Sequence, residues 1–149
     1  MKKEFKKVPL EDIPMVYKIY CEVENFEITQ EGISRAKEIY QNHILSSNGS
    51  YSYACYINDV IVGVVNVYKN WQMYPTDHDD PFVHLECVMV SPTMQNQGIG
   101  KELIINAVEL VKSEGYTYII GQSPVAAMQK IFEDAGLTER DCLDFRKNK

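Results

Sequence analysis

One stretch carries most of the structural signal in this chain, namely Val88-Met89-Val90-Ser91-Pro92-Thr93-Met94-Gln95-Asn96-Gln97-Gly98-Ile99-Gly100-Lys101. It begins as a buried strand, because apolar residues alternate and Pro92 cannot continue a central ladder. After the glycines, apolar residues recur every three or four positions to about Glu114, which predicts an amphipathic helix of roughly four turns. The stretch therefore predicts a strand, a turn, a glycine loop and a helix that opens directly from the loop.

A glycine loop in front of a helix can bind an anion. The first amides of a helix have no partner within it, and the aligned peptide dipoles leave partial positive charge there. Gly98 and Gly100 lack the Cβ atoms that would keep a phosphate away from the backbone. Two phosphate loops are excluded, because a P-loop needs Ser or Thr where Glu102 stands and a dinucleotide fingerprint needs a small residue where Leu103 stands. A turn that merely begins a helix is the remaining alternative.

The run Gln95-Asn96-Gln97-Gly98-Ile99-Gly100, after a strand ending in Val-Met-Val-Ser-Pro, resembles the Gln/Arg-x-x-Gly-x-Gly/Ala motif of the GNAT N-acetyltransferase superfamily. The resemblance extends over about residues 55–137. It implies one domain over residues 1–149 with an α/β fold, in which about four helices flank a mixed sheet containing a splayed pair of parallel strands. It also implies acetyl-CoA as co-substrate and transfer of its acetyl group to a primary amine of a small molecule or peptide.

The composition agrees with one globular domain and excludes several other classes. The chain has 149 residues, of which 45% are hydrophobic and 24% are charged. It has no membrane-length apolar run and no signal-like segment, so we expect a cytoplasmic protein. The net charge of −6, without a Lys/Arg cluster, argues against nucleic acid as a partner. Four scattered cysteines without a Cys-x-x-Cys pair argue against a metal site and predict free, buried thiols: Cys21, Cys55, Cys87 and Cys142.

The rest of the chain predicts helices and strands in the order that the resemblance requires. Thr29 is the expected N-cap of the second helix, Asn58-Asp59 is a hairpin turn, and Gly63 marks a bulge or a close packing contact. A strand, a crossover helix and a second strand around the glycine loop predict a parallel pair. The expected strands are Glu4–Val8, Tyr51–Ile57, Val60–Asn70, Phe82–Val90, Tyr116–Gly121 and one near Leu143–Arg146, and the expected helices are Leu10–Glu24, Gln30–Leu45, Gly98–Glu114 and Val125–Ala135.

The resemblance assigns acyl-CoA to the central strand and the loop behind it. The backbone of the strand end would pair with the pantetheine amides, and one of its N–H groups would polarise the thioester carbonyl. The amides of the loop would hold the pyrophosphate. The cofactor-binding residues implied in this way are Val88, Met89, Val90, Gln95, Asn96, Gln97, Gly98, Ile99, Gly100 and Lys101.

The same strand supplies two candidate catalytic bases, His84 and Glu86. Residues 84, 86, 88 and 90 share one face of a regular strand, so both groups are expected to face the same way as the cofactor-pairing valines. A carboxylate rarely lies in a buried strand unless it is paired or functional. Glu86 is therefore the first choice as the base, acting directly or through a water, and His84 is the second. A structural hydrogen bond within the strand is the alternative.

The sequence departs from the family pattern at the group that protonates the leaving thiolate. Many relatives carry a Tyr in the last helix, four residues before its terminal Gly, where this chain has Phe132. Phe132 is expected to contact the cofactor, but it has no proton to give. Gln122-Ser123-Pro124 also replaces an Asn that often precedes this helix. An acyl-CoA-binding module without turnover is therefore the alternative function, and a purely structural protein is a third.

A polar loop is expected to contribute to the acceptor site. Trp71 and Tyr74 are predicted to form a wall of the acceptor pocket, whereas the acidic run Asp77–Asp80 favours a solvated turn. His78 within this run lacks a second set of ligands, so no metal is expected. The sequence does not name the acceptor amine, and it leaves a homodimer open.

Overall fold

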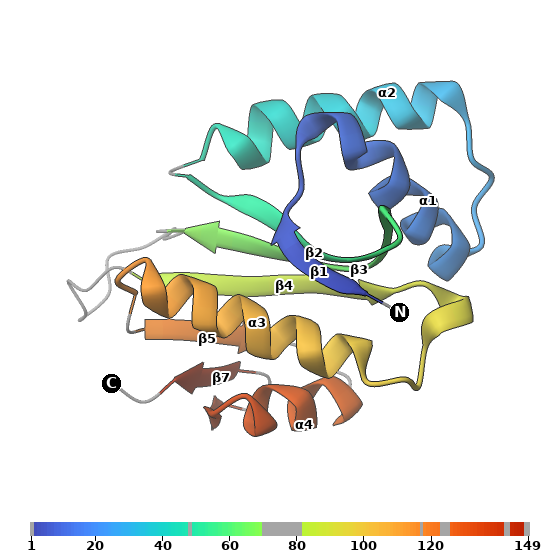
Figure 1. Ribbon diagram of the computed structural model, residues 1–149. Helices are drawn as coiled ribbons and strands as arrows, with labels where there is room; N and C mark the ends of the chain where they lie inside the picture. Colours follow the sequence, from blue (N-terminus) through green and yellow to red (C-terminus); the bar gives the residue numbers. More distant parts are fainter. Residues whose placement is uncertain are drawn as a thin grey trace.

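The computed structural model describes residues 2–47, 49–69, 82–116, 118–122, 126–141 and 144–147. These residues form a seven-stranded sheet with the order β1-β2-β3-β4-β5-β7-β6 (Figure 1). Every adjacent pair is antiparallel except β4 and β5, which are parallel, so the predicted mixed sheet and its parallel pair are confirmed. The strands are β1 (Lys3–Lys7), β2 (Tyr51–Ile57), β3 (Val60–Lys69), β4 (Phe82–Val90), β5 (Tyr118–Gln122), β6 (Leu137–Asp141) and β7 (Asp144–Lys147).

Four α-helices in the described part of the chain accompany the sheet, close to the predicted bounds. Thr29 caps the second helix, because its Oγ1 accepts a hydrogen bond of 3.0 Å from the amide of Gly32. None of the described helices is long and apolar enough to cross a membrane. The helices are α1 (Ile13–Glu24) after a 3₁₀ turn η1 (Leu10–Asp12), α2 (Gln30–Ile39) continued by a π-helical segment η2 (Tyr40–Leu45), α3 (Ile99–Ser113) after a 3₁₀ turn η3 (Pro92–Met94), and α4 (Ala126–Asp134).

The helices cover the two faces of the sheet in two separate apolar clusters. The larger cluster joins α3 and Phe132 of α4 to one face through residues such as Leu85 and Leu103. The smaller joins α1 and η2 to the other face, where Ile13 and Tyr40 pack against Val64. Figure 1 shows α1 and α2 together on the side of the sheet opposite α3. A ligand bound at the end of β4 can therefore meet two different sets of helices.

Strand β4 is interrupted by a bulge that the sequence did not reveal. Val64 of β3 pairs with Met89 of β4, and Asn66 pairs with Glu86. An advance of two residues along β3 therefore lies opposite an advance of three along β4, so β4 contains one extra residue. Cys87 lies in the extra step, and its φ of 56° is left-handed, which is uncommon outside glycine.

The bulge changes which face the strand residues occupy. Glu86 and Met89 share the face of Val64 and Asn66, towards α1, whereas Val88 and Val90 pack with the cluster under α3. The prediction that residues 84, 86, 88 and 90 share one face is therefore wrong, because the extra residue reverses the alternation beyond Cys87.

Glycine and turn positions behave as expected elsewhere in the sheet. Asn58 and Asp59 both have positive φ, of 51° and 65°, as a two-residue hairpin turn with the right twist requires. A Cβ on Gly63 would lie 3.1 Å from Cγ2 of Ile99, so this position lets α3 approach β3 closely. Strand β6, which has no counterpart among the predicted elements, follows α4 directly and completes the sheet beside β7.

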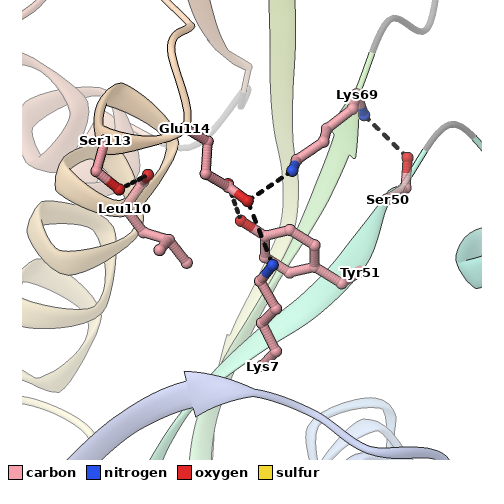
Figure 2. Close-up of polar contacts among 7 residues, drawn as sticks. All are labelled: Lys7, Ser50, Tyr51, Lys69, Leu110, Ser113 and Glu114. Atoms are coloured by element: carbon pink, nitrogen blue, oxygen red, sulfur yellow. Dashed lines mark hydrogen bonds and ion pairs between the residues drawn. The ribbon is translucent and has the colours of Figure 1, made fainter.

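A partly buried charge cluster holds the C-terminal end of α3 to the sheet (Figure 2). Glu114 accepts hydrogen bonds from Lys69 Nζ at 2.8 Å, Tyr51 Oη at 2.8 Å and Lys7 Nζ at 3.2 Å. The side chain of Lys69 is only 9% exposed. Burial works against ionisation of Glu114, but the hydrogen bonds from Lys69, Tyr51 and Lys7 outweigh it and lower the pKa of the carboxyl. One carboxylate thus joins α3 to the first three strands.

Removing this carboxylate charge should destabilise the fold. Glu114→Gln leaves the nearly buried Lys69 ammonium without its counter-charge, and we expect it to lower the free energy of unfolding by about 3 kcal/mol in urea denaturation at neutral pH. Because the folded pKa of Glu114 lies below its ordinary value of 4.5, the stabilisation is complete above that pH and is lost as the pH falls through the folded pKa. The difference between variant and wild type should therefore shrink in acid.

Glu109→Gln is the matched control for this prediction. Glu109 lies on the same helix with its side chain 68% exposed and 3.9 Å from Lys112, so its loss should change the free energy of unfolding by about 0.5 kcal/mol or less. Equal stabilities for the two variants would show that the cluster around Glu114 contributes nothing.

Candidate functional site

The parallel strands separate at the centre of the sheet. The β4–β5 ladder runs only from Phe82↔Tyr118 to Leu85↔Gly121, whereas β4 stays paired with β3 as far as Val90↔Gly63. From Glu86 to Val90 the edge of β4 that faces β5 pairs with no strand residue that the structure describes. A free strand edge presents backbone N–H and C=O groups that an extended ligand can pair with.

The glycine loop begins where this free edge ends. Gln95 connects the two, because its Nε2 donates a hydrogen bond of 3.2 Å to the carbonyl of Val90. Asn96 and Gly98 have positive φ, of 62° and 79°, and Gly98 is the N-cap of α3. The loop from Gln95 to Gly98 is exposed, and a Cβ on Gly98 would meet nothing within 4 Å, so the space above the loop is open.

The start of α3 offers unpaired amides to that space. The amide of Glu102 donates to the carbonyl of Gly98 at 3.0 Å, so the amides of Ile99, Gly100 and Lys101 precede the first helical hydrogen bond. A Cβ on Gly100 would lie 3.7 Å from both Val90 and Ile131, which places this residue between the end of β4 and α4. The side chain of Lys101 points to α4, with its ammonium 3.7 Å from Asp134. The arrangement can hold an anionic group by backbone alone.

His84 and Glu86 form a pair on the face of β4 towards α1. Nδ1 of His84 lies 2.7 Å from Oε1 of Glu86, and the imidazole is 9% exposed whereas the carboxylate is 33% exposed. The hydrogen bond from His84 lowers the pKa of Glu86 and outweighs the opposing effect of burial. Glu86 is therefore ionised at neutral pH, and the buried imidazole of His84 lies beside its carboxylate.

A cavity of about 680 Å³ lies between α1, α2 and the sheet. Cys87, Val88 and Met89 line it at the bulge, and Asn66, which pairs with Glu86 across the ladder, lines it from β3. The cavity and the free edge of β4 therefore meet at the same three residues, Cys87, Val88 and Met89. A ligand in the cavity and a ligand along the edge would contact each other there.

Phe132 and Cys87 lie in surroundings that the sequence did not reveal. Phe132 is completely buried, and a Cβ on Gly121 would lie 2.6 Å from its ring, so the ring packs against β5, and its contact with a cofactor stays a prediction. The expected burial of the Cys87 thiol is wrong. Cys87 is exposed and lines the cavity, unlike the buried thiols of Cys21 and Cys55. The bulge explains Cys87, because the reversed alternation turns it out of the core.

The other predicted site residues have a place in the structure or fall outside the described residues, and their roles stay predictions. The structure brings together Val88 to Lys101 at one end of the sheet, as predicted, with His84 and Glu86 on the adjacent face. The predicted acceptor residues Trp71 and Tyr74 lie outside the part of the chain that the structure describes. Among the described residues, no group of three or more His, Cys, Asp or Glu is placed to hold a metal ion.

Several cavity residues were not identified from the sequence. Tyr17 and Tyr20 of α1, and Ala36 and Ile39 of α2, line it opposite the sheet. The sequence did contain a signal for this surface, because the apolar residues of α1 cover more of the helix than one core-facing stripe needs. Tyr20 and Val23 are the additional residues, and they are 42% and 41% exposed.

Comparison with known proteins agrees with this geometry. An acetyltransferase from Trypanosoma brucei superposes with a TM-score of 0.71 at 17% identity, over 94% of this chain and 95% of that one. The aminoglycoside N-acetyltransferase AAC(6')-Iy, solved with CoA, gives 0.69 at 16% identity, over 94% and 90%. AAC(6')-Ib, solved with paromomycin and acetyl-CoA, gives 0.77 at 16% identity, over 100% and 94%. These likenesses show the fold, and no curated protein matches the chain in sequence.

The family itself is shown by sequence. The family model described as "Acetyltransferase (GNAT) family" matches residues 13–136, which include both helices over the cavity, the free edge of β4 and the glycine loop. The chain therefore belongs to the GNAT acetyltransferase family, and its co-substrate is acetyl-CoA.

Proposed function

We propose that the chain is an N-acetyltransferase that moves the acetyl group of acetyl-CoA directly to a primary amine of a small molecule or peptide. One observation carries this proposal: the free edge of β4 and the cavity under α1 and α2 share Cys87, Val88 and Met89. Two substrates bound on the two sides would meet at this point, as a direct transfer requires.

The chain's backbone suits the acyl donor. The edge from Glu86 to Val90 can pair with the amides of a pantetheine arm as an added strand would. The amides of Ile99, Gly100 and Lys101, with the open space above Gly98, can receive the pyrophosphate. A backbone N–H of the Val88–Val90 segment would stabilise negative charge on the thioester oxygen.

Glu86 is the proposed general base. Acetyl-CoA supplies an activated acyl group, and the acceptor nitrogen must lose a proton as its bond to the acyl carbon forms and the carbon–sulfur bond breaks. Glu86 is ionised and partly exposed, so it can take that proton directly or through a water, while His84 holds its carboxylate. The departing thiolate needs no dedicated acid. A thiol has a pKa of about 8.5, so its thiolate is stable enough to leave without being protonated.

A second candidate is a module that binds acyl-CoA without turnover. The observation in its favour is Phe132, which has no hydroxyl and is completely buried. Release of free thiol from acetyl-CoA in the presence of a panel of amines distinguishes the two functions, because only the transferase releases it in an acceptor-dependent manner.

The glycine loop yields the first test of this proposal. Gly100→Val should weaken acetyl-CoA binding at least tenfold, which corresponds to about 1.4 kcal/mol, because branched carbons would occupy the approach to the loop amides. The fold should survive, since the nearest atoms to a Cβ there lie at 3.7 Å. Calorimetric titration measures the affinity and circular dichroism confirms the fold.

Glu109→Val serves as the control for the loop variant. It introduces the same side chain at an exposed position near the other end of α3, and it should leave the affinity for acetyl-CoA unchanged. Equal affinities for Gly100→Val and wild type would exclude this loop as the cofactor site.

The base is tested by Glu86→Gln, which keeps the shape of the side chain and removes its basicity. We expect kcat to fall by roughly a hundredfold with acetyl-CoA affinity nearly unchanged. His84→Ala should cost less, and it should shift the acid limb of the kcat–pH profile upward, because the hydrogen bond from His84 lowers the pKa of Glu86. Full activity in Glu86→Gln together with none in His84→Ala would reverse the two roles.

A further inference from the structure

The chemistry of the cavity lining indicates which kind of amine it receives. Most of the lining consists of aliphatic and aromatic side chains, among them Val16, Tyr17, Ala36 and Ile39. The volume of about 680 Å³ lies within the roughly 300–1,000 Å³ of pockets that enclose small molecules. The cavity therefore suits a small ligand with a substantial apolar surface.

The lining carries almost no net charge. Within the described part of the chain, the charged residues that line it are Glu24 of α1 and Arg35 of α2, which have opposite signs. A polycation would place several ammonium groups beside one carboxylate and one guanidinium, and such groups bind poorly without matching carboxylates.

The polar groups on the floor of the cavity are engaged with one another. Tyr40 Oη donates to the carbonyl of Val8 at 2.7 Å and accepts from the amide of Ser52 at 3.1 Å. Ser52 Oγ donates to Asn66 Oδ1 at 2.6 Å, and Asn66 Nδ2 donates to Tyr68 Oη at 3.2 Å. A ligand rich in hydroxyl groups would have to break these bonds to satisfy its own.

Apolar side chains remain uncovered where the cavity opens. Tyr20, Val23 and Ile39 line it and are still 42%, 41% and 40% exposed. An apolar ligand body would remove this surface from water, which favours binding. These four features of the cavity all favour a small ligand with a mainly apolar body.

We propose that the acceptor is a primary amine carried on an aliphatic or aromatic body, and not a polycation or an amino sugar. The inference rests on the proposed transfer function and adds the substrate class to it. The amine lies at the bulge, beside Cys87 and Val88 and near Glu86, and the body lies between α1 and α2. The cavity thus differs in its ligand from that of AAC(6')-Ib, which was solved with paromomycin.

The direct test is thiol release from acetyl-CoA with four amines: 2-phenylethylamine, hexylamine, spermidine and tobramycin. We expect kcat/KM for the better of the first two to exceed that for either polycation at least a hundredfold. A polycation preferred over both apolar amines would overturn the substrate class while leaving the transfer function intact.

A binding measurement separates this inference from the transfer itself. Cys87 is exposed in the cavity, whereas Cys21 and Cys55 are buried, so a maleimide should label Cys87 in a Cys142→Ser background. We expect 2-phenylethylamine to slow labelling at least fivefold and spermidine to have no effect. Protection without thiol release would support the ligand chemistry and count against transfer, whereas no protection and no release would overturn the inference.

A matched pair of variants tests whether the amine binds in this cavity. Ile39→Glu places a carboxylate in the lining at a position that is 40% exposed, and it should lower kcat/KM for 2-phenylethylamine at least tenfold without changing acetyl-CoA affinity. Ile105→Glu makes the same change at a position that is 37% exposed on α3, over the opposite face, and should have no effect. Equal effects of the two variants would overturn the assignment of the cavity to the acceptor.

Discussion

The extra residue in β4 is the constraint on which the rest of the site depends. By reversing the alternation at Cys87, it places Glu86 towards α1 and Val88 and Val90 towards α3. A regular strand would put the carboxylate and the valines on one face, so that the base and the packing against α3 would compete for the same space. The left-handed backbone of Cys87 costs on the order of 1 kcal/mol, and the pairing with β3 on either side of it maintains that geometry.

In the proposed function, the two substrates are recognised by different parts of the chain. The donor would face backbone groups, namely the free edge of β4 and the first amides of α3. The acceptor would face side chains from α1, α2 and the floor of the sheet. Because these surfaces adjoin at the bulge in the described part of the chain, the lining of the proposed acceptor cavity could change without disturbing the proposed donor site.

The sequence predicts the donor side of this arrangement better than the acceptor side. Period-2 alternation before Pro92 and helical spacing after Gly98 identify the parallel pair, the loop and α3, because backbone periodicity leaves a direct trace in residue type. The bulge leaves no such trace, because a cysteine with positive φ has no sequence signature. The face predicted for each β4 residue after the bulge is therefore wrong. Burial of Phe132 likewise depends on the close approach of α4 to Gly121, a tertiary contact. The roles of Trp71 and Tyr74 stay predictions.

The proposed recognition of the donor by main-chain groups has an evolutionary consequence. A peptide N–H is present whatever the side chain, so a site built from a strand edge and a helix start persists while most residues around it are replaced. On the proposed function, replacements among the α1 and α2 side chains that line the cavity would change the amine accepted and leave the donor site intact.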